Sequence, residues 1–255
     1  MCGLNLEGKK YLVTGGSSGI GKATAIQISK LGGKAIINGR NEEGLKKTLS
    51  QLEGDGHNIL PFDLSNLEGI KSYIDSCIQA DGQRFDGMVF STGITANKPI
   101  LSESVDNMES VMRINFYSYF YLLHIFSSRR ILNDGGSIVA VSSRSSTHPN
   151  KAQSSYGASK AAIDAVSKVA ARELVNRGIR VNTVQPNMTL TPMISEFIDN
   201  TTEEQRKKLF PLGILEPNDI ANVIVFLLSD MSKKITGQHI YLSAGNDGRP
   251  IDFLI

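Results

Sequence analysis

The chain has 255 residues, of which 40% are hydrophobic and 20% are charged, and 27 Lys and Arg against 25 Asp and Glu leave a formal charge of +2. This length and composition predict a globular chain with a sizeable core. Because the charges are balanced, electrostatics gives no reason to expect binding to nucleic acid or to a membrane surface. The N-terminus has no signal-peptide pattern, and the longest apolar run, Val223 to Leu228, is too short to span a bilayer. We therefore expect no membrane partner. Cys2 and Cys77 form no metal-ligand cluster and are too far apart in sequence to suggest a disulfide framework, so we expect no metal site and a reducing, cytoplasmic location.

Short apolar runs alternate with longer amphipathic ones along the chain, which is typical of strand and helix units around a parallel sheet. We expect strands at Lys10–Thr14, Lys34–Gly39, Asn58–Phe62, Gly87–Ser91, Ser137–Ser142, Arg180–Val184 and His239–Leu242. We expect helices at Gly19–Leu31, Glu42–Leu52, Leu67–Ala80, Val105–Leu132, Ser154–Arg177 and Pro217–Ser229. The pattern predicts an α/β chain with one Rossmann domain over residues 1–255, in which a doubly wound, mostly parallel seven-stranded sheet carries helices on both faces. Residues 186–215 interrupt this rhythm and are interpreted as a substrate lid.

The first expected strand runs into a glycine-rich loop, Thr14-Gly15-Gly16-Ser17-Ser18-Gly19-Ile20-Gly21, and then into a helix. Such glycines let the backbone approach a pyrophosphate, which the N–H groups of the helix start attract. The spacing Thr-Gly-x-x-x-Gly-x-Gly resembles that of the classical short-chain dehydrogenase/reductase family, and the resemblance extends from Leu6 to about Gly245. It implies a nicotinamide dinucleotide bound by Gly15, Ser17, Ser18, Gly19, Ile20 and Gly21.

The second expected strand ends at Gly39-Arg40, where NAD-preferring sites place a carboxylate that binds the ribose 2′-hydroxyl. A guanidinium suits a 2′-phosphate instead. NADP(H) is therefore expected rather than NAD(H), although a solvated arginine at a helix start is the alternative for Arg40. By resemblance Asp63, followed by Leu64, reads the adenine; a turn or N-cap aspartate is the alternative.

Tyr156 and Lys160 are spaced to share one face of a helix, and Ser143 ends the strand before it. With Asn115, these residues match the active site of the resembled family. Because a tyrosine pKa of about 10 is unsuited to catalysis at neutral pH, we expect Lys160 to lower the pKa of Tyr156, the general acid/base. Ser143 donates a hydrogen bond to the developing oxyanion, with Ser142 as the competing serine. The resemblance also implies that Lys160 binds the nicotinamide ribose and that Asn115 holds a water.

The resemblance adds Gly93, Pro186, Asn187 and Thr191 to the cofactor residues, with Gly93 beside the adenosine ribose. Two motifs depart from the family pattern. Phe90-Ser91-Thr92-Gly93 replaces Asn-Asn-Ala-Gly, so some hydrogen bonds of the sheet must be made differently. Pro186-Asn187 replaces Pro-Gly, and asparagine tolerates the left-handed backbone that such a turn requires.

Other side chains around these motifs are candidates for substrate contacts. Arg144 and Lys151 can attract a carboxylate or phosphate, and His148 can line the substrate mouth; for all three a surface role is the alternative. The apolar C-terminal tail, residues 246–255, can pack at a subunit interface or reach a neighbouring active site.

Together these features predict an NADP(H)-dependent oxidoreductase that interconverts a ketone and a secondary alcohol, similar to 3-oxoacyl-(acyl-carrier-protein) reductases. The expected partners are a small carbonyl or alcohol substrate and further copies of the chain, in a homotetramer or homodimer formed through the two longest helices. The alternatives are a catalytically weak NADP(H)-binding regulatory protein and an NAD-dependent alcohol dehydrogenase.

Overall fold

The computed structural model describes residues 4–246 and contains one sheet of seven strands. The strands are β1 (Lys10–Val13), β2 (Lys34–Ile37), β3 (Asn58–Ile59), β4 (Phe85–Phe90), β5 (Leu132–Val141), β6 (Arg180–Pro186) and β7 (His239–Leu242). Their order is β3-β2-β1-β4-β5-β6-β7, and every neighbouring pair is parallel. The predicted doubly wound α/β fold is confirmed, with a sheet that is wholly parallel.

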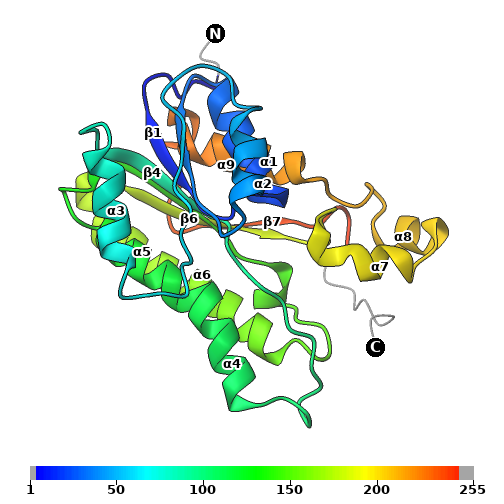
Figure 1. Ribbon diagram of the computed structural model, residues 1–255. Coiled ribbons are helices and arrows are strands. Elements are labelled where there is room, and N and C mark those ends of the chain that lie inside the picture. The colour runs from blue at the N-terminus through cyan, green and yellow to red at the C-terminus, as the bar shows by residue number, and fades with distance from the viewer. Residues whose placement is uncertain (1–3, 247–255) are drawn as a thin grey trace.

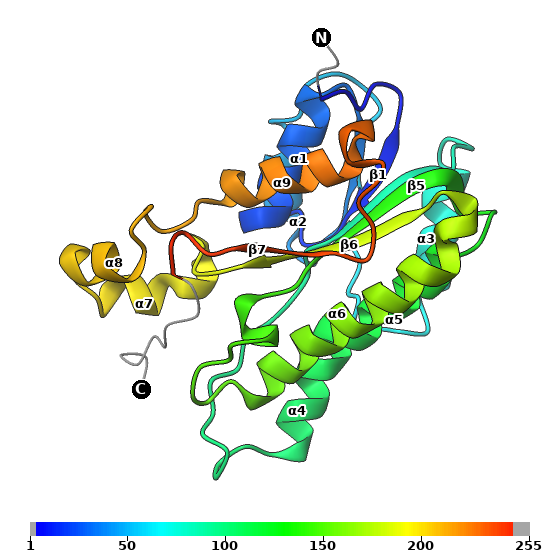
Figure 2. The ribbon, with the colours of Figure 1, turned by 180° about the vertical axis from the view of Figure 1, so that it is seen from behind.

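Helices cover both faces of this sheet (Figures 1 and 2). One face carries α1 (Gly19–Lys30), α2 (Glu42–Leu49) and α9 (Pro217–Leu228); the other carries α3 (Ile70–Gln79), α5 (Ser118–Phe126) and α6 (Ser154–Leu174), with α4 (Val105–Met112) continuing beyond the sheet. Short 3-10 turns lie at Arg144–Ser146, Val175–Arg177, Pro192–Ile194 and Asp230–Ser232. Within residues 4–246, no helix combines the length and apolar character needed to cross a bilayer.

The sheet is buried between two apolar layers. Leu12, Met88 and Phe90 pack with α3, α5 and α6, whereas Val13 and Val89 pack with α1 and α9. Every residue of β1 and of β6 is buried, as expected for parallel strands that are covered on both faces. This burial holds the strands in place, so that side chains in the loops after their carboxyl ends have defined positions at that edge of the sheet.

The long helix predicted over Val105–Leu132 is wrong. The structure has α4, a π-helical turn at Arg113–Tyr117 and then α5, which ends at Phe126, whereas Leu132 begins β5. Arg177, in the 3-10 turn after α6, stabilises the end of α5 and the start of β5: its guanidinium donates to the carbonyl oxygens of Ser127 and Leu132, the latter at 2.7 Å. It also pairs with Asp134 at 2.7 Å.

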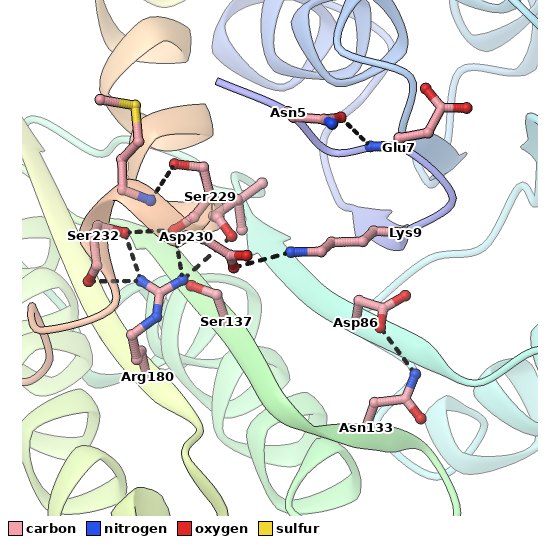
Figure 3. Close-up of polar contacts among 12 residues, drawn as sticks. Asn5, Glu7, Lys9, Asp86, Asn133, Ser137, Arg180, Ser229, Asp230 and Ser232 are labelled. Atoms are coloured by element: carbon pink, nitrogen blue, oxygen red, sulfur yellow. Dashed lines mark hydrogen bonds and ion pairs between the residues drawn. The ribbon is translucent and has the colours of Figure 1, made fainter. Parts of the chain in front are cut away.

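The amino edge of the sheet is closed by polar contacts (Figure 3). Arg180 is buried at the start of β6 and donates to the carbonyl oxygens of Leu228 at 3.2 Å and Ser229 at 3.1 Å, and to the Ser232 hydroxyl at 2.7 Å. These carbonyls end α9, where a cation is favoured by the helix dipole. Nearby, Lys9 pairs with Asp230 at 3.1 Å. These contacts connect β6, the end of α9 and the N-terminal segment, so the amino edge of the sheet contributes to the stability of the fold.

Residues 186–215 leave the carboxyl end of β6 and contain two short helices, α7 (Ser195–Asp199) and α8 (Glu203–Leu209), which project beyond the sheet (Figure 2). Within this segment the sequence predicts a short helix over Thr202–Leu209, close to α8, and none at α7. Phe197, Leu209 and Phe210 form a small core with Ala244, separate from the two layers on the sheet. A capping box between Thr202 and Gln205 begins α8. This segment forms its own small unit over the carboxyl edge of the sheet.

Candidate active site

A cleft of about 860 Å³ lies along the carboxyl edge of the sheet. Its walls come from the loops after β1, β2, β4, β5 and β6, the first part of α6 and the segment 186–215. One end is lined by the glycine loop, Arg40 and Asp63, and the lining also includes Ser143, Tyr156 and Lys160. Open α/β sheets bind ligands in this crevice, and the volume lies within the range of known ligand pockets.

Two glycines of the glycine loop have backbone conformations and close neighbours that disfavour any side chain. Gly15 and Gly19 adopt φ angles of +67° and +53°. A Cβ on Gly15 would lie 2.8 Å from the carbonyl oxygen of Ser91, and one on Gly19 would lie 3.1 Å from Cγ2 of Thr191. Ser18 makes no side-chain capping bond to α1, whose first turn carries no acidic residue, so the helix start suits an anion.

Ser17, Ser18 and Ile20 line the cleft with these glycines, whereas Gly21 is absent from its described lining. A Cβ on Gly21 would overlap the carbonyl oxygen of Gly15. Gly21 therefore allows α1 to pack against the loop, and its predicted contact with a pyrophosphate stays a prediction.

Arg40 and Asp63 lie near each other at the nucleotide end of the cleft, beside the buried Leu64. Nη1 of Arg40 lies 3.9 Å from Oδ2 of Asp63, and both side chains are exposed. Oδ1 of Asp63 accepts a hydrogen bond from the Ser65 amide at 2.9 Å. That bond, with a smaller contribution from Arg40, lowers the pKa of Asp63. Asp63 is thus a turn aspartate that also faces the cleft.

Ser143, Tyr156 and Lys160 meet where β5 ends and α6 begins. Nζ of Lys160 donates to the carbonyl oxygen of Val141 at 2.8 Å and lies 5.7 Å from the centroid of the Tyr156 ring. The Ser142 hydroxyl instead donates to the backbone carbonyl of Lys160 at 3.2 Å. Ser142 therefore has a structural partner.

Burial has the largest effect on the pKa values of Lys160 and Tyr156. It lowers the pKa of Lys160 to about 8, against a smaller opposing effect of Asp164. It raises the pKa of Tyr156, and a hydrogen bond with Ser143 opposes the rise. The sequence predicts a lowered pKa for Tyr156, so this part of the prediction is corrected: desolvation of the phenolate exceeds the opposing interactions in the chain itself.

Asn115 lies behind the cleft wall, in the π-helical turn between α4 and α5. Its Oδ1 accepts from the Ile94 amide at 2.8 Å, and its Nδ2 donates to the Ile94 carbonyl at 2.9 Å and to the Ser159 hydroxyl at 3.0 Å. A Cβ on Gly93 would lie 3.4 Å from both Oδ1 of Asn115 and Nζ of Lys160. Gly93 thus lines the cleft beside Lys160, and its place at the adenosine ribose stays a prediction.

The two departures from the family pattern have local explanations. The amides of Ser91 and Thr92 donate to the buried Thr14 hydroxyl at 3.0 and 3.2 Å, which supplies the altered hydrogen bonds. Asn187 is not left-handed: among the described non-glycine residues, only Ala152 and Ala244 have positive φ. Its amide continues the ladder to Leu242 at 3.0 Å, so the expected turn geometry is corrected.

Pro186, Asn187 and Thr191 line the cleft as expected, and the segment 186–215 also contributes Met188, Met193 and Phe197. Of the candidate substrate residues, Arg144 lines the cleft; His148 and Lys151 are exposed and do not belong to its described lining. Sequence reasoning missed Asn150 and Gln153, although Gln153 precedes Tyr156 by three residues at the start of α6. The C-terminal tail lies outside the described residues from 247 onward.

Residues 15–247 match the protein family described as Enoyl-(Acyl carrier protein) reductase. The chain is 33% identical over 245 residues to the 3-oxoacyl-[acyl-carrier-protein] reductase FabG of Thermotoga maritima, covering 95% of this chain and 99% of that one. It is 32% identical to the D-threitol dehydrogenase of Mycolicibacterium smegmatis, covering 94% and 93%. The chain is thus similar over nearly its full length to a reductase and to a dehydrogenase.

Solved structures agree with this similarity. A dehydrogenase/reductase from Sinorhizobium meliloti superposes with a TM-score of 0.87 at 31% identity, over 96% of this chain and 97% of that one. A short-chain dehydrogenase/reductase from Brucella melitensis, described as a glucose/ribitol dehydrogenase, superposes with a TM-score of 0.88 at 28% identity, over 94% of this chain and 97% of that one. The chain therefore belongs to the short-chain dehydrogenase/reductase family of oxidoreductases.

Proposed function

We propose that the protein is an NADP(H)-dependent oxidoreductase that interconverts a ketone and a secondary alcohol, in the manner of the 3-oxoacyl-[acyl-carrier-protein] reductases it resembles. The observation that carries this proposal is the single cleft that joins an anion-binding glycine loop to Ser143, Tyr156 and Lys160. The lining fits an extended dinucleotide, because the cleft is lined both by the glycine loop at the start of α1 and by Lys160.

The side chains divide the chemistry between them. When bound, the nicotinamide supplies or accepts the hydride at the substrate carbon. The Ser143 hydroxyl donates a hydrogen bond to the substrate oxygen, and Tyr156 donates its proton to that oxygen during reduction. Burial raises the pKa of Tyr156, so the phenol carries its proton at neutral pH. The same rise makes the phenol a weaker acid, so proton transfer depends on positive charge supplied beside it.

Lys160 supplies the positive charge of the site and, by family resemblance, holds the nicotinamide ribose. Asn115 acts from behind the wall: its amide fixes the backbone at Ile94 and reaches Ser159, the neighbour of Lys160 on α6. The water that the resemblance assigns to Asn115 stays a prediction.

The preference for NADP(H) rests on Arg40. Its guanidinium is exposed at the nucleotide end of the cleft, and Gly39 provides no carboxylate to repel a 2′-phosphate. The remaining members of the proposed cofactor site are Gly15, Ser17, Ser18, Gly19, Ile20, Gly21, Asp63, Leu64, Gly93, Pro186, Asn187 and Thr191.

The test measures oxidation of NADPH and NADH with a panel of ketones for the wild type and for Tyr156→Phe. We expect NADPH to be preferred and the variant to lose at least about 100-fold in kcat. Tyr121→Phe, which removes a hydroxyl from a half-exposed tyrosine of α5, is the matched control. Full activity of Tyr156→Phe with any ketone that the wild type reduces contradicts the mechanism.

The proposal includes a homotetramer or homodimer in the cytoplasm. Tyr117, Phe120 and Tyr121 gather on one stretch of chain with exposed fractions of 40%, 48% and 44%, and a second copy would cover such rings. Light scattering on the purified protein tests the assembly, and a monomer would contradict it.

A further inference from the structure

We propose that Asp164 is a positioning residue of the reaction, whose buried negative charge keeps the ammonium of Lys160 protonated. This rests on the proposed function, in which Lys160 supplies the positive charge of the site. Asp164 lies on α6 four residues after Lys160 and does not belong to the described lining of the cleft. It therefore acts through Lys160 and not on the substrate.

The carboxylate of Asp164 is buried, and its hydrogen-bond partners are neutral. The residue is 7% exposed. Its Oδ1 accepts from the Thr183 hydroxyl at 2.8 Å, and its Oδ2 accepts from the Gln185 amide nitrogen at 2.7 Å. Burying a charge costs free energy that neutral partners offset only in part, and an asparagine can also form two hydrogen bonds at this position. The hydrogen bonds alone therefore do not explain why the side chain is charged.

The position of this carboxylate is fixed by the strands beneath α6. Thr183 and Gln185 lie two residues apart on β6, so both side chains reach the same face of the sheet. The amide nitrogen of Gln185 also donates to the Ser146 hydroxyl at 2.9 Å, in the 3-10 turn after Ser143. An amide nitrogen has two protons, so it can make both bonds at once. These contacts hold Asp164 in one orientation.

The charge of Asp164 acts on Lys160. Residues four apart share one face of a helix, and helical side chains lean toward the N-terminus, so Asp164 leans toward the turn that carries Lys160. Burial lowers the pKa of Lys160 to about 8, and the attraction of Asp164 opposes this fall. The carboxylate thus favours the charged form of a lysine that burial disfavours.

Other titratable side chains face this pair from the elements around it: Tyr156 on α6, Tyr119 on α5, His239 on β7 and Arg144 in the turn after β5. Burial raises the pKa of both tyrosines, so both are neutral at the pH values used below. Nδ1 of His239 lies 3.7 Å from Oδ1 of Asp164, and this contact is an ion pair only when the histidine is protonated. The variants compared below share all four residues, so a difference between them reports the charge at residue 164.

Asp164→Asn tests the charge, because the amide can keep hydrogen bonds to both Thr183 and Gln185. The rate of ketone reduction is measured for wild type and variant from about pH 6 to about pH 10, which includes the pH at which Lys160 loses its proton. Without the carboxylate, we expect the alkaline fall in kcat to occur about one pH unit lower. At pH 6 the two rates should agree within about twofold, because Lys160 is then protonated in both proteins. A loss by the same factor at every pH, or an unchanged profile, would overturn the proposal.

Two variants serve as controls. Glu173→Gln removes one negative charge from an exposed position of the same helix, and it should leave the pH dependence of kcat unchanged. Gln185→Met disturbs the same hydrogen bonds and keeps the charge of Asp164, so any loss of kcat should not move the alkaline fall to lower pH. A fall displaced in Gln185→Met as far as in Asp164→Asn would show that packing and not charge is responsible, and would overturn the proposal.

Urea unfolding at pH 7 separates this inference from the proposed function, because it requires no turnover. It compares the stability gained through Lys160→Met in the wild type and in Asp164→Asn. An ammonium that has lost its neighbouring anion costs the fold more, so we expect a larger increase in the urea midpoint in Asp164→Asn. Equal increases overturn the inference even if ketones are reduced, and a larger increase supports the interaction even if none is. Asp164→Ser, which also removes the charge, replaces Asp164→Asn in both measurements if the latter does not fold, with the same expected results.

Discussion

Replacing Lys160 with methionine should stabilise the fold while it abolishes activity. Lys160 is 4% exposed, and burial lowers its pKa from the ordinary value of 10.5 to about 8. The unfolded chain therefore binds this proton more tightly than the folded chain does, and at neutral pH the fold carries the cost of keeping the ammonium charged. Methionine has a similar length and no charge to desolvate.

The magnitude follows from the shift. One pKa unit corresponds to about 1.4 kcal/mol, so a fall from 10.5 to about 8 costs roughly 3 kcal/mol of stability. The lost hydrogen bond to the Val141 carbonyl offsets about 1 kcal/mol. Lys160→Met should therefore be more stable by roughly 2 kcal/mol at pH 7. The cost is fully present below pH 8 and disappears as the pH rises from about 8 to 10.5.

Urea unfolding at pH 7 and near pH 10.5 measures the difference between variant and wild type. Other titrating groups are common to both proteins and cancel in this difference. Lys168→Met, which removes an exposed lysine from the same helix, should show no comparable change with pH. A wild type that is more stable than Lys160→Met at pH 7, or a difference that does not vary with pH, would refute the reasoning.

Three further predictions follow from the charged groups. The rate of ketone reduction should fall as the pH rises through about 8, because Lys160 loses its proton; a kcat that is constant up to pH 10 would contradict this. Arg40→Ala should raise the KM for NADPH about tenfold and change that for NADH by less than about twofold. Lys47→Ala on α2 is its control, and equal losses with both cofactors would disprove a phosphate contact. Arg180→Met should lower the free energy of unfolding by about 3 kcal/mol, because it leaves the carbonyls at the end of α9 without their donor. Lys9→Met, at an exposed ion pair, should cost less than about 1 kcal/mol in the same urea titration.

The alternation of apolar runs predicts the sheet because buried parallel strands need apolar side chains on both faces. It fails where long-range contacts decide the local structure. The apolar spacing continues through Ile131 and Leu132 as it would in a helix, yet the chain turns at Ser127 and enters β5. The guanidinium that binds both sides of this turn belongs to Arg177, far along the chain. No local pattern contains that information.

In the candidate site, too, sequence spacing predicts some features and long-range packing decides others. Spacing places Ser143, Tyr156 and Lys160 together because a strand end and one helix face define their positions. The donor end of Gln153 depends instead on which neighbours bind its oxygen, and Gly21 packs against Gly15 although it belongs to the glycine motif. The balance of burial against charge at Tyr156 likewise needs the packed structure. Sequence spacing predicts which residues meet, and three-dimensional packing determines how each is oriented and charged.

Three buried cations show how the fold separates stability from chemistry. Nζ of Lys10 has acceptors for all three protons, at Cys77 O, Asp81 Oδ1 and Gln83 O, within 2.6 to 3.1 Å. Arg180 is similarly surrounded by carbonyl and hydroxyl oxygens at the amino edge. Nζ of Lys160 donates one hydrogen bond, to Val141, although an ammonium has three protons to donate. Its remaining donors lie at the carboxyl edge, where the cleft can receive a ligand. This difference in hydrogen bonding explains why removing Arg180 should destabilise the protein while removing Lys160 should stabilise it, and it identifies Lys160 as a buried cation with donors available to a ligand.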